Sequence, residues 1–215
     1  MNTYIRTTDC DVLVVGAGPT GLTLAAQLLA RGIRTRVIDK DPGLPRLSRA
    51  IGIAPRTLET LDMMGIADRF LDEGHRVRGI SLYTAGKRLL GIDMAHSGSA
   101  YQFMLHLPQH RTEALLRARV AELGGSIETG VELFDLVAGQ DTVGARVRDV
   151  SGREHTDTAG FVVGCDGAHS RVRHLLEAPF TGQPYPWDWC SPTRTWTGPE
   201  ARTKCTCSPG RTDSR

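Results

Sequence analysis

A Gly-x-Gly-x-x-Gly turn near the N-terminus constrains the fold of this chain more than any other feature. Residues 11–39 read DVLVVGAGPTGLTLAAQLLARGIRTRVID. The apolar, mostly β-branched run at 12–15 predicts a strand buried on both faces of a parallel sheet. The amphipathic segment from about Thr20 to Arg31 predicts a helix, and a second strand follows and ends at Asp39. This order predicts a βαβ unit at the start of an α/β fold.

Each residue type in the turn has a predicted role. Gly16 permits the tight turn out of the strand, Gly18 lets the backbone approach a pyrophosphate, and Gly21 lets the helix pack close to the sheet. The start of the helix then presents free N–H groups to the phosphates. Asp39, 23 residues after Gly16, is spaced to accept hydrogen bonds from the ribose of an adenosine. Its carboxylate disfavours a 2′-phosphate, so the turn predicts FAD or NAD and not NADP. A glycine-rich turn without a ligand is the alternative.

Bulk composition excludes several other classes of protein. The 215 residues suffice for one domain or a domain with a subdomain. No apolar stretch reaches the ~18 residues that span a bilayer, and the N-terminus lacks the apolar core of a signal peptide, so we expect a cytoplasmic chain. A net charge of +2 with scattered arginines gives no basic stripe for nucleic acid. The five cysteines have neither disulfide-framework nor zinc-site spacing, so no metal site is expected.

The remaining chain up to residue 189 alternates short helices and strands. Residues 40–55 are rich in turn formers and predict a loop over the phosphate region. Predicted helices lie at about 56–64, 111–123 and 170–177. Predicted strands lie at 79–83, 87–93, 102–107, 126–129, 132–138, 142–149, 154–158 and 160–164. The run at 160–164 is apolar again and is expected to rejoin the parallel sheet.

A second motif, GCDGAHSRVR, occupies residues 164–173 at the end of that apolar strand. Ligands of open α/β sheets gather beyond the carboxyl ends of the strands, so Asp166 is predicted to face the same pocket as the first glycine turn. A turn that caps the following helix is an equal alternative, because Asp and Ser are favoured capping residues.

Together the two motifs resemble the FAD-dependent aromatic and polyketide hydroxylases, the single-component flavoprotein monooxygenases that include para-hydroxybenzoate hydroxylase. The first is the turn at 16–21 with its following acid, and the second matches the family signature D-G-x-x-S-x-V-R at 166–173. Between them, SRA at 48–50 leads to PRTLE, and PQ at 108–109 leads to RTEALL, in the family's order. The similarity covers about residues 9–189. It implies a Rossmann-like FAD-binding fold with a parallel sheet and an antiparallel β subdomain, incomplete at its C-terminal end.

The resemblance implies cofactor contacts residue by residue. The pyrophosphate would be held by the glycine turn, the ribose by Asp39, and the adenine side would lie near Lys40. Arg49 would approach the pyrophosphate or ribityl chain, and Gln109 the flavin side. Asp166 would reach the pyrophosphate region through water and help form the groove for the nicotinamide donor. The full set of cofactor-binding residues implied is Gly16, Gly18, Pro19, Thr20, Gly21, Asp39, Lys40, Arg49, Gln109, Asp166 and Gly167.

The family's chemistry implies that NADPH or NADH reduces the flavin and that an oxygen atom of O₂ passes to an aromatic or polyketide substrate. Because the cofactor carries that chemistry, no catalytic acid or base is assigned to the chain. No nucleic acid or membrane partner is expected, and the oligomeric state is left open. Other FAD oxidoreductases of the superfamily, of epoxidase or halogenase type, and a nucleotide-binding module without activity are the alternatives.

The chain departs from the family at its C-terminal end. Residues 190–215 contain no Ile, Leu, Val, Phe or Met, which predicts disorder. The family's second flavin signature, Gly-Asp-Ala-x-His, is missing, and no Gly-Asp pair occurs anywhere in the chain. We therefore expect a truncated FAD-binding domain over 1–189, with a β insertion at about 77–107 belonging to the substrate-side sheet, and an out-of-frame tail over 190–215. Such a chain is expected to bind FAD weakly, to lack activity and to expose apolar sheet surface.

Overall fold

The structure is a computed structural model that describes residues 8–43, 50–84 and 87–182. The chain divides into two compact units, each described by itself below. Of the described residues, the first unit holds 8–43, 50 and 108–179, and the second holds 51–84, 87–107 and 180–182. The predicted disorder of 190–215 lies outside the described residues. Of the helices that the structure describes, none has the length and apolar character needed to cross a membrane.

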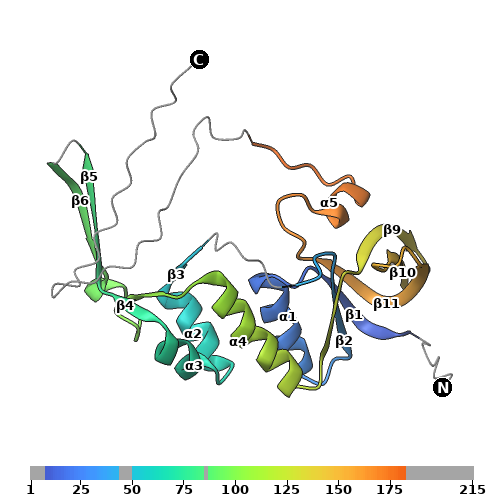
Figure 1. The fold of residues 1–215 in the computed structure, drawn as a ribbon, viewed down its shortest axis with the longest axis horizontal. Coiled ribbons are helices and arrows are strands. Elements are labelled where there is room, and N and C mark those ends of the chain that lie inside the picture. Colours follow the sequence, from blue (N-terminus) through green and yellow to red (C-terminus); the bar gives the residue numbers. More distant parts are fainter. Residues whose placement is uncertain (1–7, 44–49, 85–86, 183–215) are drawn as a thin grey trace, which may run out of the picture. The chain divides into compact units, whose positions relative to one another are not determined.

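A six-stranded mixed sheet forms the centre of the first unit, in the order β8-β2-β1-β11-β10-β9 (Figure 1). The strands β8, β2, β1 and β11 run parallel to one another. Strand β10 pairs antiparallel with β11, and β9 pairs antiparallel with β10. The strands are β1 (Cys10–Val15), β2 (Thr35–Asp39), β8 (Ser126–Thr129), β9 (Glu132–Ala138), β10 (Val143–Arg148) and β11 (Glu154–Gly164). The sheet confirms the predicted α/β fold with a parallel sheet.

Strand β1 lies in the middle of this sheet because its side chains are apolar on both faces. Leu13 and Val14 point to opposite faces, and both are fully buried. Val15 is paired with Ile38 of β2 and with Gly164 of β11. The carboxyl ends of three parallel strands therefore meet at one edge, which is where an open α/β sheet holds its ligands.

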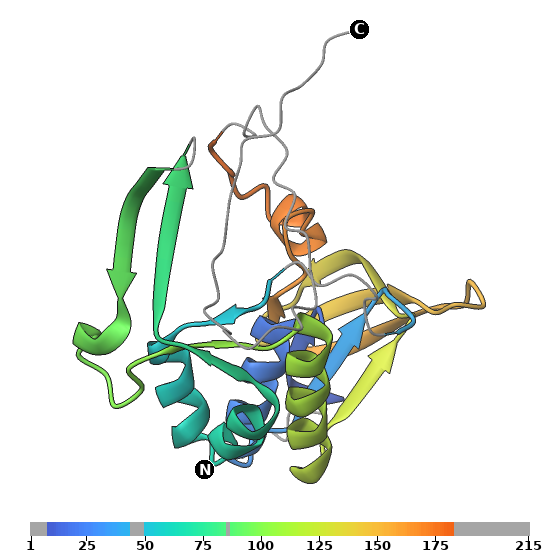
Figure 2. The same ribbon diagram turned by 60° about the vertical axis from the view of Figure 1, so that its left-hand side comes forward.

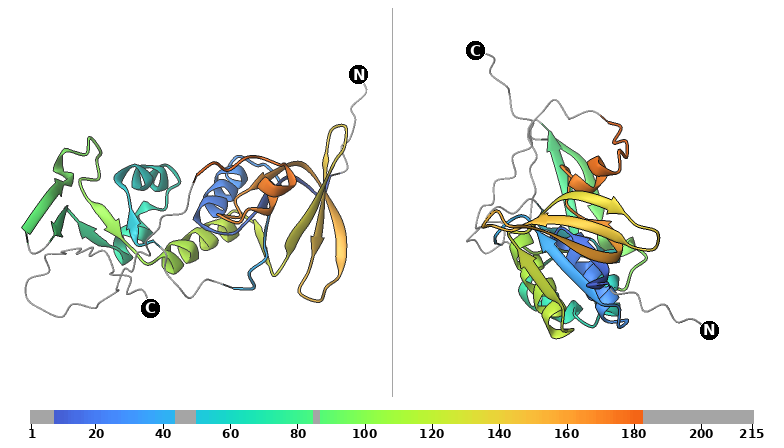
Figure 3. Two further views of the ribbon diagram at one scale, coloured as in Figure 1. Left: turned by 90° about the horizontal axis from the view of Figure 1, so that it is seen from above. Right: turned by 90° about the vertical axis from the view of Figure 1, so that its right-hand side faces the viewer.

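Strand β11 joins the parallel and antiparallel parts of the sheet. Its first half pairs antiparallel with β10 from Glu154 to Ala159, and its second half pairs parallel with β1 from Ala159 to Gly164. Sequence reasoning expected two strands here, at 154–158 and 160–164. They form one strand of 11 residues, because the chain stays extended through Gly160. The strands β9, β10 and β11 form a twisted ribbon at one end of the unit (Figure 3).

Helices α1 (Pro19–Leu29) and α4 (Gln109–Glu122) lie side by side on one face of the sheet (Figures 1 and 2). Leu22 of α1 and Val120 of α4 are fully buried there. Helix α1 ends two residues before the predicted Arg31, and Gly32 follows with a φ of +75°, which glycine adopts at low cost. On the other face, Val172 of the short helix α5 (Arg171–Leu175) packs against a core built from β1, β2, β9, β10 and β11.

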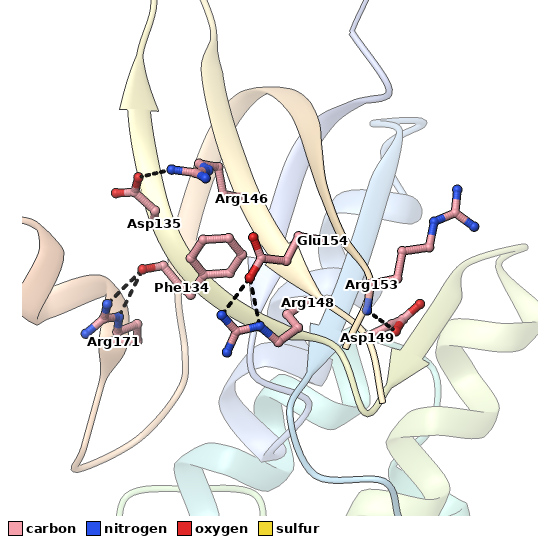
Figure 4. A network of polar contacts seen from close by, with 8 residues as sticks. All are labelled: Phe134, Asp135, Arg146, Arg148, Asp149, Arg153, Glu154 and Arg171. Atoms are coloured by element: carbon pink, nitrogen blue, oxygen red, sulfur yellow. Dashed lines mark hydrogen bonds and ion pairs between the residues drawn. The ribbon is translucent and has the colours of Figure 1, made fainter. Parts of the chain in front are cut away.

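The outer side of the ribbon carries a network of charged side chains around an aromatic ring (Figure 4). The guanidinium carbons of Arg146 and Arg148 lie 5.1 and 5.0 Å from the centre of the Phe134 ring. Such cation–π contacts between an arginine and an aromatic ring stabilise the folded chain modestly at exposed sites. Arg171 donates to the backbone carbonyl of Phe134 at 2.8 Å. This last bond ties the start of α5, and the loop before it, to the edge strand β9.

The second unit contains two small sheets and short helices. Strands β3 (Gly52–Ile53), β7 (Met104–His106) and β4 (His75–Val77) form one antiparallel sheet, and β5 (Gly79–Thr84) pairs with β6 (Lys87–Asp93) in a hairpin. The helices are α2 (Pro55–Met63), α3 (Ala67–Glu73) and the 3₁₀ turn η1 (Met94–His96). Sequence reasoning predicted α2, β5, β6 and β7 but missed β3, β4, α3 and η1. The apolar β6 side chains Leu89, Leu90 and Ile92 are exposed.

Candidate functional site

A groove of about 410 Å³ opens at the carboxyl ends of β1, β2 and β11, entirely within the first unit. Nine of the eleven sequence-predicted cofactor residues line it: Gly16, Gly18, Pro19, Thr20, Asp39, Lys40, Gln109, Asp166 and Gly167. The fold thus brings the first glycine turn together with the Asp-Gly loop about 150 residues later in the chain. The predicted residue Arg49 lies outside the described residues.

The three glycines of the turn serve different steric purposes. Gly16 has a φ of +107°, and a Cβ there would lie 2.3 Å from the backbone oxygen of Cys165. A Cβ on Gly21 would lie 1.9 Å from the backbone oxygen of Gly16, so this glycine allows α1 to pack close, as the motif predicts. Gly21 does not line the groove. A Cβ on Gly18 would meet nothing within 4 Å, because this glycine borders open space in the groove.

The N-terminus of α1 faces this open space with free donors. The first bond inside the helix runs from the Leu22 N–H to the Gly18 carbonyl at 3.0 Å. The N–H groups of Thr20 and Gly21 therefore lie ahead of the intrahelical ladder. No side chain among the described residues caps this end. Free donors and the positive end of the helix dipole make such a terminus a binding position for an anion.

Asp39 closes the turn from the end of β2. One carboxylate oxygen accepts a hydrogen bond from the Ala17 N–H at 2.5 Å, and the other accepts from the Asp41 N–H at 2.9 Å. An ionised carboxylate has about four acceptor positions. Asp39 can thus brace the glycine turn and still accept from a ligand hydroxyl group.

The Asp166 carboxylate is engaged with the start of α5. It accepts from the Ser170 hydroxyl at 2.6 Å and from the Val172 N–H at 3.2 Å, and it also accepts from the Arg171 N–H. These bonds match the capping role that sequence reasoning held as the alternative for Asp166. The residue still borders the groove, and Gly167 turns the chain beside it with a φ of +78°. A contact to a ligand through water is compatible with these bonds.

Helix α4 contributes a polar wall to the groove. Gln109 donates from its amide nitrogen to a carboxylate oxygen of Glu113 at 2.9 Å. Glu113 is only 2% exposed although it is charged. Arg117, one turn further along α4, also lines the groove. Sequence reasoning assigned no role to Glu113 or Arg117. The available signal was the repeat of four residues from Gln109 to Glu113 and from Glu113 to Arg117, because it puts all three on one helix face.

The groove is lined by both signs of charge, with an excess of carboxylates. The carboxylates belong to Asp39, Asp41, Glu113, Glu132 and Asp166, and the cations to Lys40, Arg117 and Arg171. Burial and the neighbouring Asp166 raise the pKa of the Cys165 thiol, so this thiol at the edge of the groove is neutral near pH 7. The described residues contain no group of three or more His, Cys, Asp or Glu side chains that could hold a metal ion.

Comparisons with known proteins identify the family of this chain. A family described as "FAD binding domain" matches residues 9–206. The chain is 41% identical over 188 residues to 6-methylpretetramide 4-monooxygenase of Streptomyces rimosus, covering 86% of this chain and 32% of that protein. It is 40% identical over 177 residues to rifampicin monooxygenase of Streptomyces venezuelae, covering 81% and 35%.

The solved structure of aklavinone-11 hydroxylase in complex with FAD and aklavinone has the same fold, with a TM-score of 0.72 and 32% sequence identity. The match covers 82% of this chain and 36% of the hydroxylase. The chain belongs to the FAD-dependent aromatic and polyketide hydroxylase family. The cofactor of this family is FAD. The chain spans about a third of the length of the curated relatives it matches.

Proposed function

We propose that this chain forms the part of a flavoprotein monooxygenase that binds the adenosine diphosphate half of FAD. The enzyme concerned would hydroxylate an aromatic or polyketide substrate with NADH or NADPH and O₂. One observation carries the proposal: the free N-terminus of α1, Asp39 and the Asp166–Gly167 loop border a single groove. The names of two matched relatives, 6-methylpretetramide 4-monooxygenase and rifampicin monooxygenase, support this class of substrate.

The groove fits an adenosine diphosphate group by shape and by chemistry. Gly18 leaves open space where a pyrophosphate would approach the backbone, and the N–H groups of Thr20 and Gly21 supply donors. Asp39 would accept from the ribose hydroxyl groups, and Lys40 would lie on the adenine side. Gln109 would face the flavin, with its amide held by Glu113. Arg49 is assigned to the pyrophosphate or the ribityl chain by family resemblance alone.

Bound flavin supplies the redox and oxygen chemistry of the reaction. The residues of this chain bind and orient it. Asp166 would order water against the pyrophosphate and help shape the path of the nicotinamide donor, while its direct bonds hold the start of α5. We extend this assignment to a partial FAD-binding domain over residues 1–189 in which no residue acts as catalytic acid or base.

Titration of the purified chain with FAD tests the proposal. Quenching of flavin fluorescence measures binding, and competition with ADP and with FMN shows which half of the cofactor is recognised. We expect ADP to displace FAD and FMN to fail, because the described groove is built for the adenosine end. A chain that binds no FAD, or one from which FMN displaces FAD as well as ADP does, would overturn the proposal.

We also propose that the 215-residue polypeptide alone does not turn over, because it contains no Gly-Asp pair of the family's second flavin signature. Oxygen uptake driven by NADPH and stimulated by an aromatic substrate is the assay. The expected rate equals that of free FAD. Substrate-dependent uptake well above that background would contradict this part of the proposal without affecting the assignment of the FAD site.

A further inference from the structure

One face of α4 presents three polar side chains to the groove at intervals of four residues. Gln109, Glu113 and Arg117 all border it, as residues on one stripe of a helix do. Gln109 and Glu113 bind each other. Arg117 makes no such bond. Within the part of the chain that the structure describes, its Nε atom is buried and has no hydrogen-bond partner.

The isolation of Arg117 needs an explanation. A Glu and an Arg four residues apart on a helix usually attract each other, yet Glu113 accepts from Gln109, and no ion pair joins it to Arg117 within the described residues. A buried donor without a partner costs roughly 1–3 kcal/mol, and more when it belongs to a charged group. An unpaired buried donor calls for an explanation, and a ligand in the groove that Arg117 lines would supply a partner for its guanidinium.

The general geometry of an α-helix agrees with this explanation. Arg117 lies eight residues after Gln109, which corresponds to about 12 Å along the helix axis. Side chains of a helix tilt toward its N-terminus, so the long arginine extends toward the end of α4 where Gln109 lies. That end borders the groove beside the start of α1, where the free N–H groups face an anion.

We propose that Arg117 is a further cofactor-binding residue, whose guanidinium donates to the phosphate oxygens of the adenosine diphosphate half of FAD. This inference rests on the proposed function. A dianionic pyrophosphate entering a groove with excess carboxylates needs cations. The guanidinium of Arg171 is committed to the Phe134 carbonyl, and Lys40 offers a point charge. Arg117 supplies a planar fork of donors, which matches the geometry of phosphate oxygens.

The test compares FAD, ADP and adenosine binding to the wild-type chain and to Arg117→Gln, Arg117→Lys and Arg119→Gln. Arg119 is the matched control, because it lies on the same helix, pairs with Glu122 at 3.3 Å and does not line the groove. We expect Arg117→Gln to weaken FAD and ADP at least tenfold and adenosine less than twofold. Arg117→Lys should weaken FAD about threefold, since it keeps the charge and loses the fork. Arg119→Gln should bind FAD as the wild type does.

Thermal unfolding without ligand separates this role from a structural one. Because no described residue bonds the Arg117 Nε atom, the midpoint of Arg117→Gln should equal or exceed that of the wild type. The loss of a structural arginine would lower the midpoint. Unchanged FAD affinity, a lowered midpoint, or equal losses for adenosine and ADP would each overturn the inference. If Arg117→Gln does not fold, wild-type FAD affinity in Arg117→Lys overturns it. A wild-type chain that binds neither FAD nor ADP refutes the proposed function itself, and the inference with it.

Discussion

Replacing Gly21 by alanine tests the steric argument for the glycine turn without any cofactor. The added Cβ would lie 1.9 Å from the backbone oxygen of Gly16, more than an ångström short of the 3.0 Å that real Cβ atoms keep. The atom in the way is a backbone oxygen, so the clash cannot be relieved by the movement of a side chain. Helix α1 must shift away from β1, which loosens the buried contacts of Leu22. Overpacking of this kind costs about 3 kcal/mol, or roughly 6–12 °C in thermal midpoint for a chain of this size.

Gly18→Ala is the matched control for that experiment. Gly18 has a φ of −75°, which any residue adopts, and a Cβ there meets nothing within 4 Å. Its thermal midpoint should therefore equal or slightly exceed the wild type, because alanine restricts the unfolded chain. Its FAD affinity should fall, since the methyl group enters the space assigned to the pyrophosphate. Equal stability of Gly21→Ala and Gly18→Ala, measured by circular dichroism, would refute the reasoning.

Two further predictions concern charged groups. Arg36 contacts the buried Asp157 at 3.1 Å and Glu128 at 2.9 Å. Arg36→Met should cost about 3 kcal/mol, because Asp157 keeps only His155, 3.5 Å away, as a charged partner. Arg34→Met removes an exposed pair with Asp11 and should destabilise the chain much less. Equal denaturation midpoints for the two variants would contradict this. Burial, with a smaller effect of His75, lowers the pKa of His106 below 6.5. The unfolded chain then binds more protons just below pH 6.5, and stability should fall as the pH drops through that range. His106→Gln should flatten this dependence in thermal unfolding measured from pH 5 to 7, and an unchanged slope would exclude His106 as its source.

The elements predicted correctly are those whose pattern is local. Strand β1 is a run of apolar, mostly β-branched residues, and α4 ends at Gly124 and Gly125, so both could be placed to within a few residues. Strands β3 and β4 have only two and three residues. They exist because His106 of β7 pairs with Gly52 on one side and His75 on the other. Such pairing depends on distant segments and leaves no periodicity in a stretch so short.

The candidate site divides in the same way. The glycine turn and Asp39 follow a fixed spacing, so their meeting in one groove could be predicted. On α4, Gln109 was predicted through the family resemblance. Spacing alone could not decide the places of Glu113 and Arg117, because the rotation of the helix against α1 decides whether they border the groove or lie in solvent. Sequence reasoning also left two roles open for Asp166. Its bonds to Ser170 and Val172 supply the capping role. Its position beside the groove also allows the second role, a contact with a ligand.

The close approach of Gly16 to Cys165 has a consequence for how the chain acquires its pocket. Two backbone segments separated by about 150 positions lie so near that no methyl group fits between them. The glycine turn is therefore not finished by the first βαβ unit, which leaves the ribosome early. At synthesis rates of 5–20 residues per second, β1 waits roughly 7–30 seconds for β11 to be made. During that interval one edge of the nascent strand β1 has no neighbouring strand. Its unpaired backbone groups then need protection by a chaperone that binds the chain near the exit tunnel.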